Sequence, residues 1–363
     1  MRLRTQKFKF LSFSGIASLI LLSILTSCES KSKDEKTPEM THVAAEEQII
    51  ENNEARKIKN YMEGNELNGS VFVSVANTPI FKGGFGYADF EKRTKNTVKT
   101  TFPIASLTKM VVAASFLQMK EKGLLNLNDP IGKYIIGFPN GQNIKLIHLL
   151  TNTSGITSPS WSGISVIPKD IVNEIKKSPI IFQAGANWNY QDANYILLSY
   201  ILEKVSGISL HEYIKKNIFS IAEMKSSGFI TRKNTFPYAA KGYFKVQNHF
   251  EPIGKLNIHL LYGAGDMYST VEDINKFDTA LMECRFFSKK SLDEMMVPRS
   301  KSHYGLGIYI YNDYLFSRGT LGGWNAVHVY FKDKTNVVLL LNARSRKMDI
   351  LKNAKEIHQL IKK

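Results

Sequence analysis

The order of strand-like and helix-like segments constrains the fold of this 363-residue chain more than any other feature. Two short runs rich in β-branched and aromatic residues, at 71–75 and 79–88, predict a hairpin near its beginning. Helical apolar spacing then dominates, and strand-like runs return after residue 300. This order predicts an α+β fold. The two chain ends would join in one antiparallel sheet flanked by helices, with a mostly helical lobe inserted between them.

Individual elements can be placed within this order. Helices are expected at 106–121, 144–150, 169–177, 192–205, 210–218 and 271–282, with a final amphipathic helix at 349–361. Strands are expected at 304–311, 314–317, 326–331 and 336–342. A cleft between the sheet and the helical lobe is where a site is expected.

The first 27 residues have the pattern of an export signal. Four cations lie within residues 2–9, an apolar run follows at 10–25, and Cys28 comes directly after small residues. This segment resembles the lipoprotein signal of bacteria, which implies cleavage before Cys28 and acylation of that residue. An ordinary signal peptide and an uncleaved anchor are the alternatives. We therefore expect an exported, membrane-anchored lipoprotein of the bacterial cell envelope.

The net charge of +16 raises the question of a polyanionic partner. The lysines are scattered rather than clustered with aromatic residues, and an exported protein seldom meets nucleic acid. We therefore expect no nucleic-acid partner. Attraction to an anionic envelope surface is one explanation of the charge. A solvated basic surface without a specific role is the other, and we prefer it.

The sequence Ser106-Leu107-Thr108-Lys109 carries the clearest chemical signal. Positions i and i+3 of a helix share a face, so Lys109 can reach the hydroxyl of Ser106. A serine becomes a nucleophile when a neighbouring base takes its proton. The positive end of the helix would stabilise an oxyanion and help to keep Lys109 neutral. The spacing alone is a weak signal and recurs at 30–33, but position 106 follows a strand-like segment and opens a long apolar helix.

This context resembles the active-site segment of the serine β-lactamase and penicillin-binding protein superfamily, in particular its class C β-lactamase-related serine hydrolases. Further similar segments follow in the family's order, over about residues 65–343. They are 144–156, similar to HLLTHTSGL; 182–192, similar to F-x-PG and YSN; 263–270, similar to a glycine-rich turn before a helix; and Tyr-Gly-Leu-Gly at 304–307. The resemblance implies a transpeptidase-like fold and an acyl-enzyme, with Ser106 as nucleophile and Lys109 as base.

The resemblance places Tyr190 on the tyrosine of the family's Tyr-x-Asn motif, where a phenol can shuttle the proton. Asp192 replaces the asparagine of that motif. A carboxylate accepts hydrogen bonds but cannot donate them, so a substrate carbonyl would lose its usual donor. Asp192 could instead pair with Lys109 and keep it charged, or simply cap the helix that begins there. The sequence leaves these interpretations open.

The third motif departs further from the family. The family has Lys-Thr-Gly or His-x-Gly on a strand beside the site, and the matching residues here are Ser317, Arg318 and Gly319. Glycine would let a substrate approach the strand. The N–H groups of Thr320 and Ser106 would form the oxyanion hole. Arg318 would bind a substrate carboxylate, although strand alternation directs neighbouring side chains to opposite faces.

These signals divide the chain into three parts. We predict a lipoprotein signal peptide at 1–27, a polar tether with a first helix at 28–60, and one catalytic domain at 61–363. The sheet lobe of this domain would cover about 61–100 and 300–363, and its helical lobe about 101–299.

The expected activity is hydrolysis of amide, β-lactam or ester carbonyls in a small molecule or peptide, with peptides derived from peptidoglycan among the expected substrates. No cofactor is expected, since no two histidines have the spacing of a zinc motif. The altered second and third motifs favour an esterase or peptidase over an efficient β-lactamase. The alternative is an envelope binding or sensor protein with weakened catalysis, because the fold alone does not fix the function.

Overall fold

The computed structural model describes residues 53–160, 167–231, 235–247 and 249–362. The predicted signal peptide, Cys28 and most of the tether lie outside the described residues. The structure begins with α1 (Asn53–Gly64), which passes the expected limit of the first helix at residue 60. Within these ranges, no helix combines the length and hydrophobicity that spanning a bilayer requires.

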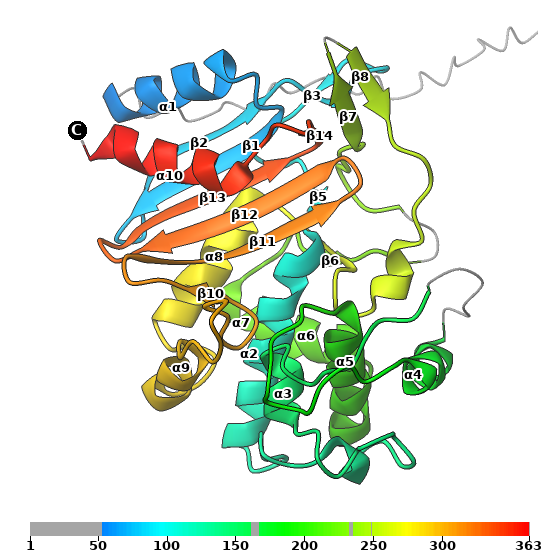
Figure 1. The fold of residues 1–363 in the computed structure, drawn as a ribbon. Coiled ribbons are helices and arrows are strands. Elements are labelled where there is room, and N and C mark those ends of the chain that lie inside the picture. The colour runs from blue at the N-terminus through cyan, green and yellow to red at the C-terminus, as the bar shows by residue number, and fades with distance from the viewer. Residues whose placement is uncertain (1–52, 161–166, 232–234, 248, 363) are drawn as a thin grey trace, which may run out of the picture. The chain divides into compact units, whose positions relative to one another are not determined.

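Both ends of the described chain meet in one antiparallel sheet, which confirms the predicted fold class. In the described residues its six strands have the order β10-β11-β12-β13-β1-β2 (Figure 1). Neighbouring strands β1 and β13 join the two ends, with Val71 opposite Leu339. The bounds are β1 (Gly69–Val75), β2 (Thr78–Phe85), β10 (Tyr309–Ile310), β11 (Tyr314–Leu321), β12 (Trp324–Phe331) and β13 (Thr335–Leu341).

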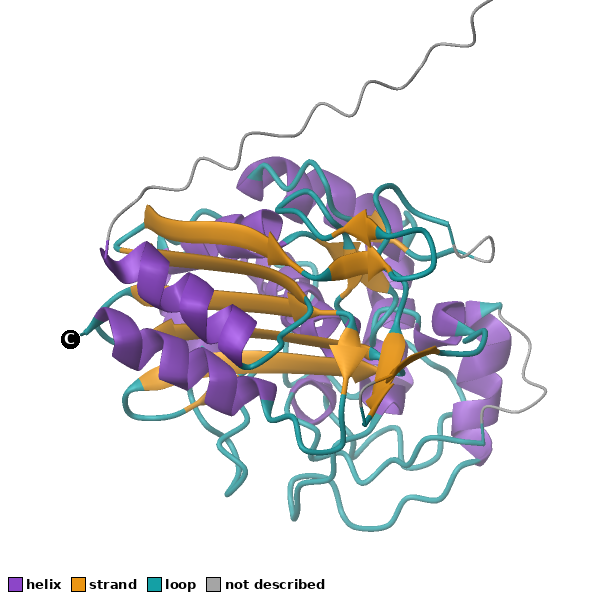
Figure 2. Cartoon of the chain, turned by 90° about the horizontal axis from the view of Figure 1, so that it is seen from above, coloured by secondary structure: helices purple, strands orange, loops and turns teal. Residues whose placement is uncertain are grey.

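Helices cover both faces of this sheet. Helix α1 and helix α10 (Ile350–Ile361) lie side by side on one face (Figure 2). Helix α8 (Val271–Met282) packs on the other face. Because both faces are covered, β1 and β13 are buried almost throughout and show little polar alternation.

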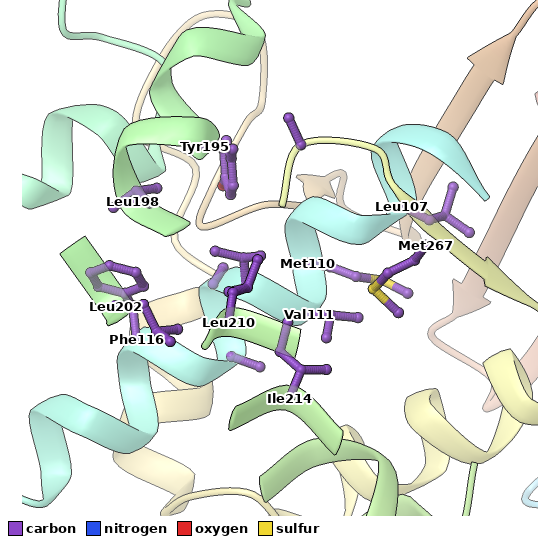
Figure 3. Close-up of a cluster of buried hydrophobic side chains, with 14 of the residues drawn as sticks. Leu107, Met110, Val111, Phe116, Tyr195, Leu198, Leu202, Leu210, Ile214 and Met267 are labelled. Atoms are coloured by element: carbon purple, nitrogen blue, oxygen red, sulfur yellow. The ribbon is translucent and has the colours of Figure 1, made fainter. Parts of the chain in front are cut away.

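Helix α2 (Thr108–Glu121) is the centre of the helical lobe. Its residues from Thr108 to Met119 are all buried, so it lacks the polar face of a surface helix. Helices α5 (Asp192–Ser206) and α6 (Leu210–Ile214) pack against it. Figure 3 shows the apolar side chains at this contact, among them Met110, Val111, Phe116, Leu198, Leu202, Leu210 and Ile214. The remaining helices of the lobe include α3 (Leu146–Leu150), α4 (Pro168–Lys177), α7 (Ser220–Ala222) and α9 (Lys289–Met295).

Smaller sheets join segments that are distant in the sequence. The sheet of β5, β9 and β6 matters most for the site, because the N–H of Ile104 continues it by donating to the carbonyl of Met267 at 2.9 Å. The segment before Ser106 therefore lies beside the turn at 263–266. The bounds are β3 (Tyr87–Asp89), β4 (Thr94–Lys95), β5 (Phe102–Pro103), β6 (Gly228–Phe229), β7 (Tyr243–Val246), β8 (His249–Pro252), β9 (Met267–Ser269) and β14 (Ala343–Arg344).

The prediction of a strand at 304–311 is wrong for most of these residues, because only Tyr309–Ile310 forms a strand there. Gly307 has a φ of +78° and packs so closely on α2 that a Cβ would lie 2.7 Å from the carbonyl oxygen of Lys109. The chain turns here instead of extending. The next strand is longer than predicted, since β11 continues to Leu321.

Candidate active site

Ser106 lies at the beginning of the central helix. It belongs to a 3-10 turn, Ala105–Leu107, that leads directly into α2. Ala105 has a φ of +47°, a left-handed conformation that is costly for a residue with a side chain. Ser106 is half-buried, whereas Ala105 and Leu107 are buried. The bend therefore leaves Ser106 accessible at the N-terminal end of α2.

Lys109 is buried beside Ser106 and contacts three oxygen atoms of the described residues. Its Nζ lies 3.1 Å from Oγ of Ser106, 2.7 Å from Oδ1 of Asp192 and 2.6 Å from the carbonyl oxygen of Ala264. A lysine ammonium has three N–H donors. These contacts therefore suit a protonated Lys109 that donates a hydrogen bond to the Ser106 hydroxyl.

The charge state of Lys109 follows from these partners. Burial alone would lower its pKa, but the carboxylate of Asp192 and the phenol of Tyr190 outweigh burial and raise the pKa of Lys109 above its usual value. The expectation that the helix end keeps Lys109 neutral is therefore wrong. A helix N-terminus carries about half a unit charge, whereas Asp192 is a full opposite charge at 2.7 Å.

The structure distinguishes between the interpretations of Asp192. Gln191 is the capping residue of α5, and Asp192 is the first residue of that helix, so the capping role does not belong to Asp192. Its carboxylate instead pairs with Lys109, and the exposed fractions of the Lys109 and Asp192 side chains are 1% and 32%. The ring centroid of Tyr190 lies 5.0 Å from Nζ of Lys109. The predicted residues Ser106, Lys109, Tyr190 and Asp192 therefore come together in one place.

The turn at 152–155 positions the Tyr190 motif. Asn152 is fully buried, and its Oδ1 accepts hydrogen bonds from the N–H of Gln191 and from Nδ2 of Asn194. The carbonyl of Asn152 also accepts the N–H of Asn189 at 2.9 Å. This segment, noted in the sequence only for its family-like pattern, thus fixes the backbone that carries the motif.

Aromatic rings lie beside Tyr190. Trp188, Tyr190 and Tyr304 have ring centroids between 6.0 and 6.2 Å apart. Burial raises the pKa of Tyr304 well above its usual value and raises that of Tyr309 to about 12. Both phenols are therefore protonated at neutral pH, and they bring no negative charge to the site.

Strand β11 approaches Ser106 through Gly319. A Cβ at Gly319 would lie 2.1 Å from the carbonyl oxygen of Ile104 and 2.8 Å from the nitrogen of Ser106. Only glycine allows this approach. Ser317 lies on the same face of the strand, but its hydroxyl donates to the carbonyl of Gly307 at 3.0 Å. Ser317 is therefore engaged within the protein, whereas Gly319 brings the strand close to Ser106.

The N–H of Thr320 points to the open edge of β11. On that edge, the carbonyl of Tyr314 accepts the N–H of Tyr311. Strands β11 and β12 pair without a register shift, so every second residue of β11 directs its backbone groups the same way as Tyr314. Thr320 is such a residue, and β10 pairs only with the beginning of β11. The direction of this N–H therefore suits a donor to a bound ligand.

Arg318 does not share the face of its neighbours Ser317 and Gly319. It is exposed, and strand alternation puts its side chain on the face that carries the buried Phe316. The substrate contact expected from the motif would therefore require the guanidinium to reach around the edge of the strand.

Two features of the site carry no recognisable sequence signal. Ala264 contacts Lys109 through its carbonyl, a group that nearly any residue supplies. Asp266 is buried, accepts the N–H of Gly263 at 2.9 Å and contacts Nε2 of His211 at 2.8 Å. The Asp266 carboxylate thereby holds the turn that presents the carbonyl of Ala264. The glycine-rich pattern marks a turn here but not its contact.

Known proteins resemble this chain over most of its length. The model of the β-lactamase family matches residues 55–360. A putative penicillin-binding protein of Bacillus subtilis (strain 168), PbpX, is 34% identical over 321 residues, which cover 87% of this chain and 81% of that protein. The teichoic acid D-alanine hydrolase of Staphylococcus aureus (strain MRSA252) is 31% identical over 293 residues, or 80% of this chain and 74% of that protein. The crystal structure of FmtA from Staphylococcus aureus superimposes with a TM-score of 0.77 at 28% identity, covering 85% of this chain and 87% of that one.

Proposed function

Because this chain belongs to the β-lactamase family, we propose that it is a serine hydrolase that forms an acyl-enzyme at Ser106. The observation that carries the proposal is the 3.1 Å contact between Oγ of Ser106 and Nζ of Lys109 at the beginning of α2. A lysine beside a serine hydroxyl can activate it as a nucleophile once the lysine is neutral. The reacting group is an ester, amide or β-lactam carbonyl.

The reaction proceeds in two steps. Ser106 attacks the carbonyl carbon, while neutral Lys109 takes the hydroxyl proton and Tyr190 passes it to the leaving group. The N–H groups of Ser106 and Thr320 donate to the oxyanion, and Gly319 leaves room for it. Water then hydrolyses the acyl-enzyme and restores Ser106.

Two observations favour a small D-aminoacyl ester or amide over a β-lactam. The relative in Staphylococcus aureus is named a teichoic acid D-alanine hydrolase. In addition, this chain lacks Lys-Thr-Gly and has Asp192 in place of an asparagine that could donate to an acylamino carbonyl. D-alanyl esters and amides are therefore the substrate class to test first, and the corresponding enzyme would be an esterase or a peptidase. Peptides derived from peptidoglycan present the same D-alanyl carbonyl with an acylated amino group, so they are the comparison substrates.

Intact mass spectrometry tests the acyl-enzyme. Purified protein is mixed with a penicillin and, separately, with a p-nitrophenyl ester. A covalent adduct or released nitrophenol is expected, and both should vanish in Ser106→Ala. Ser115→Ala is the matched control, since the Ser115 hydroxyl lies on the same helix and bonds to the carbonyl of Val111. If both reagents give no adduct and no turnover, the proposal is overturned.

A second candidate is an envelope binding or sensor protein of the same fold. The contacts of Lys109 favour it, because a lysine with three acceptors donates to Ser106 and does not take its proton. Isothermal titration calorimetry with D-alanyl esters and peptides separates the candidates. If the chain is a binding protein, the wild type and Ser106→Ala should bind these ligands with the same affinity, and neither should turn them over.

We also propose that Cys28 carries a lipid anchor in the bacterial cell envelope. The support is the sequence of residues 1–28. Several acyl chains on one residue would give durable membrane attachment, since each buried CH₂ contributes about 0.8 kcal/mol. Cys28→Ala should abolish incorporation of labelled palmitate and move the protein to the soluble fraction. Incorporation that persists in this variant would contradict the proposal.

A further inference from the structure

The carboxylate of Asp192 is only partly used by the protein. Its Oδ1 accepts from Lys109 at 2.7 Å, yet 32% of the Asp192 side chain is exposed. In the described part of the chain, Lys109 is the one cation within 4.0 Å of this carboxylate. A second oxygen therefore remains for a donor that enters from solvent.

Lys109 in this arrangement is a proton donor. Its contacts with Ser106, Asp192 and Ala264 use the three N–H groups of an ammonium. A neutral lysine has two N–H groups and one lone pair, and it needs that lone pair to accept the proton of Ser106. Something must therefore remove one proton from Lys109 before the serine can attack.

We propose that Asp192 binds the free α-ammonium group of an aminoacyl substrate, and that this second cation releases Lys109 to act as the base. The inference rests on the acyl-enzyme function proposed above. It narrows the substrate class to α-aminoacyl esters whose amino group is unblocked.

Charge and hydrogen bonding both favour an ammonium group beside Asp192. An N-acylated substrate presents a carbonyl that needs a donor, and an ionised Asp192 offers only acceptors. An ammonium supplies donors together with a positive charge. The rings of Tyr190 and Trp188, whose centroids lie 6.2 Å apart, add aromatic surface of the kind that attracts cations.

A cation bound at Asp192 also shifts the protonation equilibrium of Lys109 toward the neutral amine. Two like charges that share one carboxylate repel each other, and the buried Lys109 is the one that burial already disfavours. The α-amino group of an ester substrate has a pKa near that of a free α-amine, about 8, so it enters largely as the ammonium at neutral pH. Lys109 then releases a proton to solvent.

The remaining steps balance in atoms and protons. Neutral Lys109 accepts the hydroxyl proton of Ser106 as Oγ bonds to the carbonyl carbon. That proton passes through Tyr190 to the ester oxygen as the C–O bond breaks and the alcohol leaves. Water adds to the acyl-enzyme, and the free amino acid departs. Lys109 regains its proton from solvent when Asp192 is vacated.

The test compares D-alanine methyl ester with N-acetyl-D-alanine methyl ester, which differ only at the amino group. Release of each amino acid is followed by chromatography for the wild type and for Asp192→Asn. The wild type should prefer the free amine in kcat/KM by about 10- to 100-fold, the range of one hydrogen-bonded charge. Asp192→Asn should lose or invert this preference, because its amide can donate to the acetyl carbonyl.

Two further variants control the comparison. Asp192→Glu keeps the charge and should keep part of the preference. Asp293→Asn removes an exposed carboxylate of α9 that pairs with Lys289, and it should leave the preference unchanged. Thermal melts of each variant report its folding.

The outcomes separate this inference from the proposed function. A wild type that hydrolyses both esters without preferring the free amine overturns the inference, whatever the variants do. An Asp192→Asn variant that slows both esters by the same factor also overturns it, because Asp192 would then act only through Lys109. A wild type that hydrolyses neither ester and forms no adduct at Ser106 removes the proposed function itself.

Discussion

The ammonium of Lys109 lies 2.6 Å from the backbone carbonyl of Ala264, although the two residues are 155 positions apart. The carbonyl belongs to a turn whose first N–H, that of Gly263, is held by the buried carboxylate of Asp266. The same turn leads into β9, which pairs with the segment before Ser106. A backbone oxygen thereby becomes part of the environment that sets the protonation state of Lys109.

Replacing Asp266 by alanine should lower both stability and activity. The change leaves the N–H of Gly263 without its acceptor, which costs about 1–3 kcal/mol for a buried group. We expect a lower melting temperature and a loss of about tenfold or more in kcat as the carbonyl of Ala264 moves. Asp266→Asn keeps an acceptor for Gly263 and should retain most of the activity. An unchanged kcat in Asp266→Ala would mean that the turn does not control the lysine.

Gly319→Ala should abolish most turnover. The new methyl group would lie 2.1 Å from the carbonyl oxygen of Ile104, so β11 must move away from Ser106. The geometry of the proposed oxyanion donors, the N–H groups of Ser106 and Thr320, is then lost, and we expect kcat to fall by about 100- to 1,000-fold. Ester turnover checks this. Gly64→Ala, at a site with open space around it, is the matched control and should leave kcat unchanged. Equal kcat values for Gly319→Ala and Gly64→Ala would contradict the close approach of β11 to Ser106.

Activity toward an uncharged ester should rise steadily with pH. Against the effect of burial, Asp192 and Tyr190 raise the pKa of Lys109, so little free base exists at neutral pH. The fraction of free base grows about tenfold with each pH unit below the pKa. We therefore expect kcat/KM for N-acetyl-D-alanine methyl ester to increase from about pH 7 to about pH 10 without a plateau.

The variant Asp192→Asn provides the check on this pH profile. It removes the carboxylate that raises the pKa of Lys109, so its profile should level off at a lower pH than that of the wild type. Spontaneous hydrolysis, measured without enzyme, is subtracted at each pH. A wild-type plateau near neutral pH would show that Lys109 is already neutral in the free enzyme.

Asn152→Gly should loosen the segment that carries Tyr190. Asn152 has a φ of +56°, which glycine adopts without strain, so the change isolates the loss of the side chain. Its Oδ1 no longer accepts from Gln191 and Asn194, and we expect the free energy of unfolding to fall by about 1–3 kcal/mol, with a lower kcat. Denaturant unfolding and ester turnover measure both effects. The exposed Asn140, with a φ of +52°, offers the control Asn140→Gly, which should change neither quantity.

Local periodicity explains which elements the sequence predicts well. The helix expected at 192–205 is observed as Asp192–Ser206, because its apolar spacing is regular and Gly207 ends it with a left-handed residue. The hairpin of β1 and β2 is likewise confirmed. The hairpin of β7 and β8 was not predicted, because Phe244 and Val246 are exposed and its pattern does not follow burial.

Residues at 304–308 show the opposite failure. They belong to the run 304–311, whose tyrosines and isoleucines predict a strand, but the left-handed Gly307 lets the chain turn against α2. No local pattern reports that contact, since the neighbour that requires it lies almost 200 positions earlier in the sequence.

The sequence by itself determined the order of the elements and the pairing of Ser106 with Lys109. Both depend on local spacing, because residues i and i+3 of one helix are neighbours in any fold that contains the helix. Only the tertiary structure decided the charge of Lys109. Its other partners, Asp192 and Ala264, lie 83 and 155 positions away, and proton affinity depends on the distance to such charges and on burial.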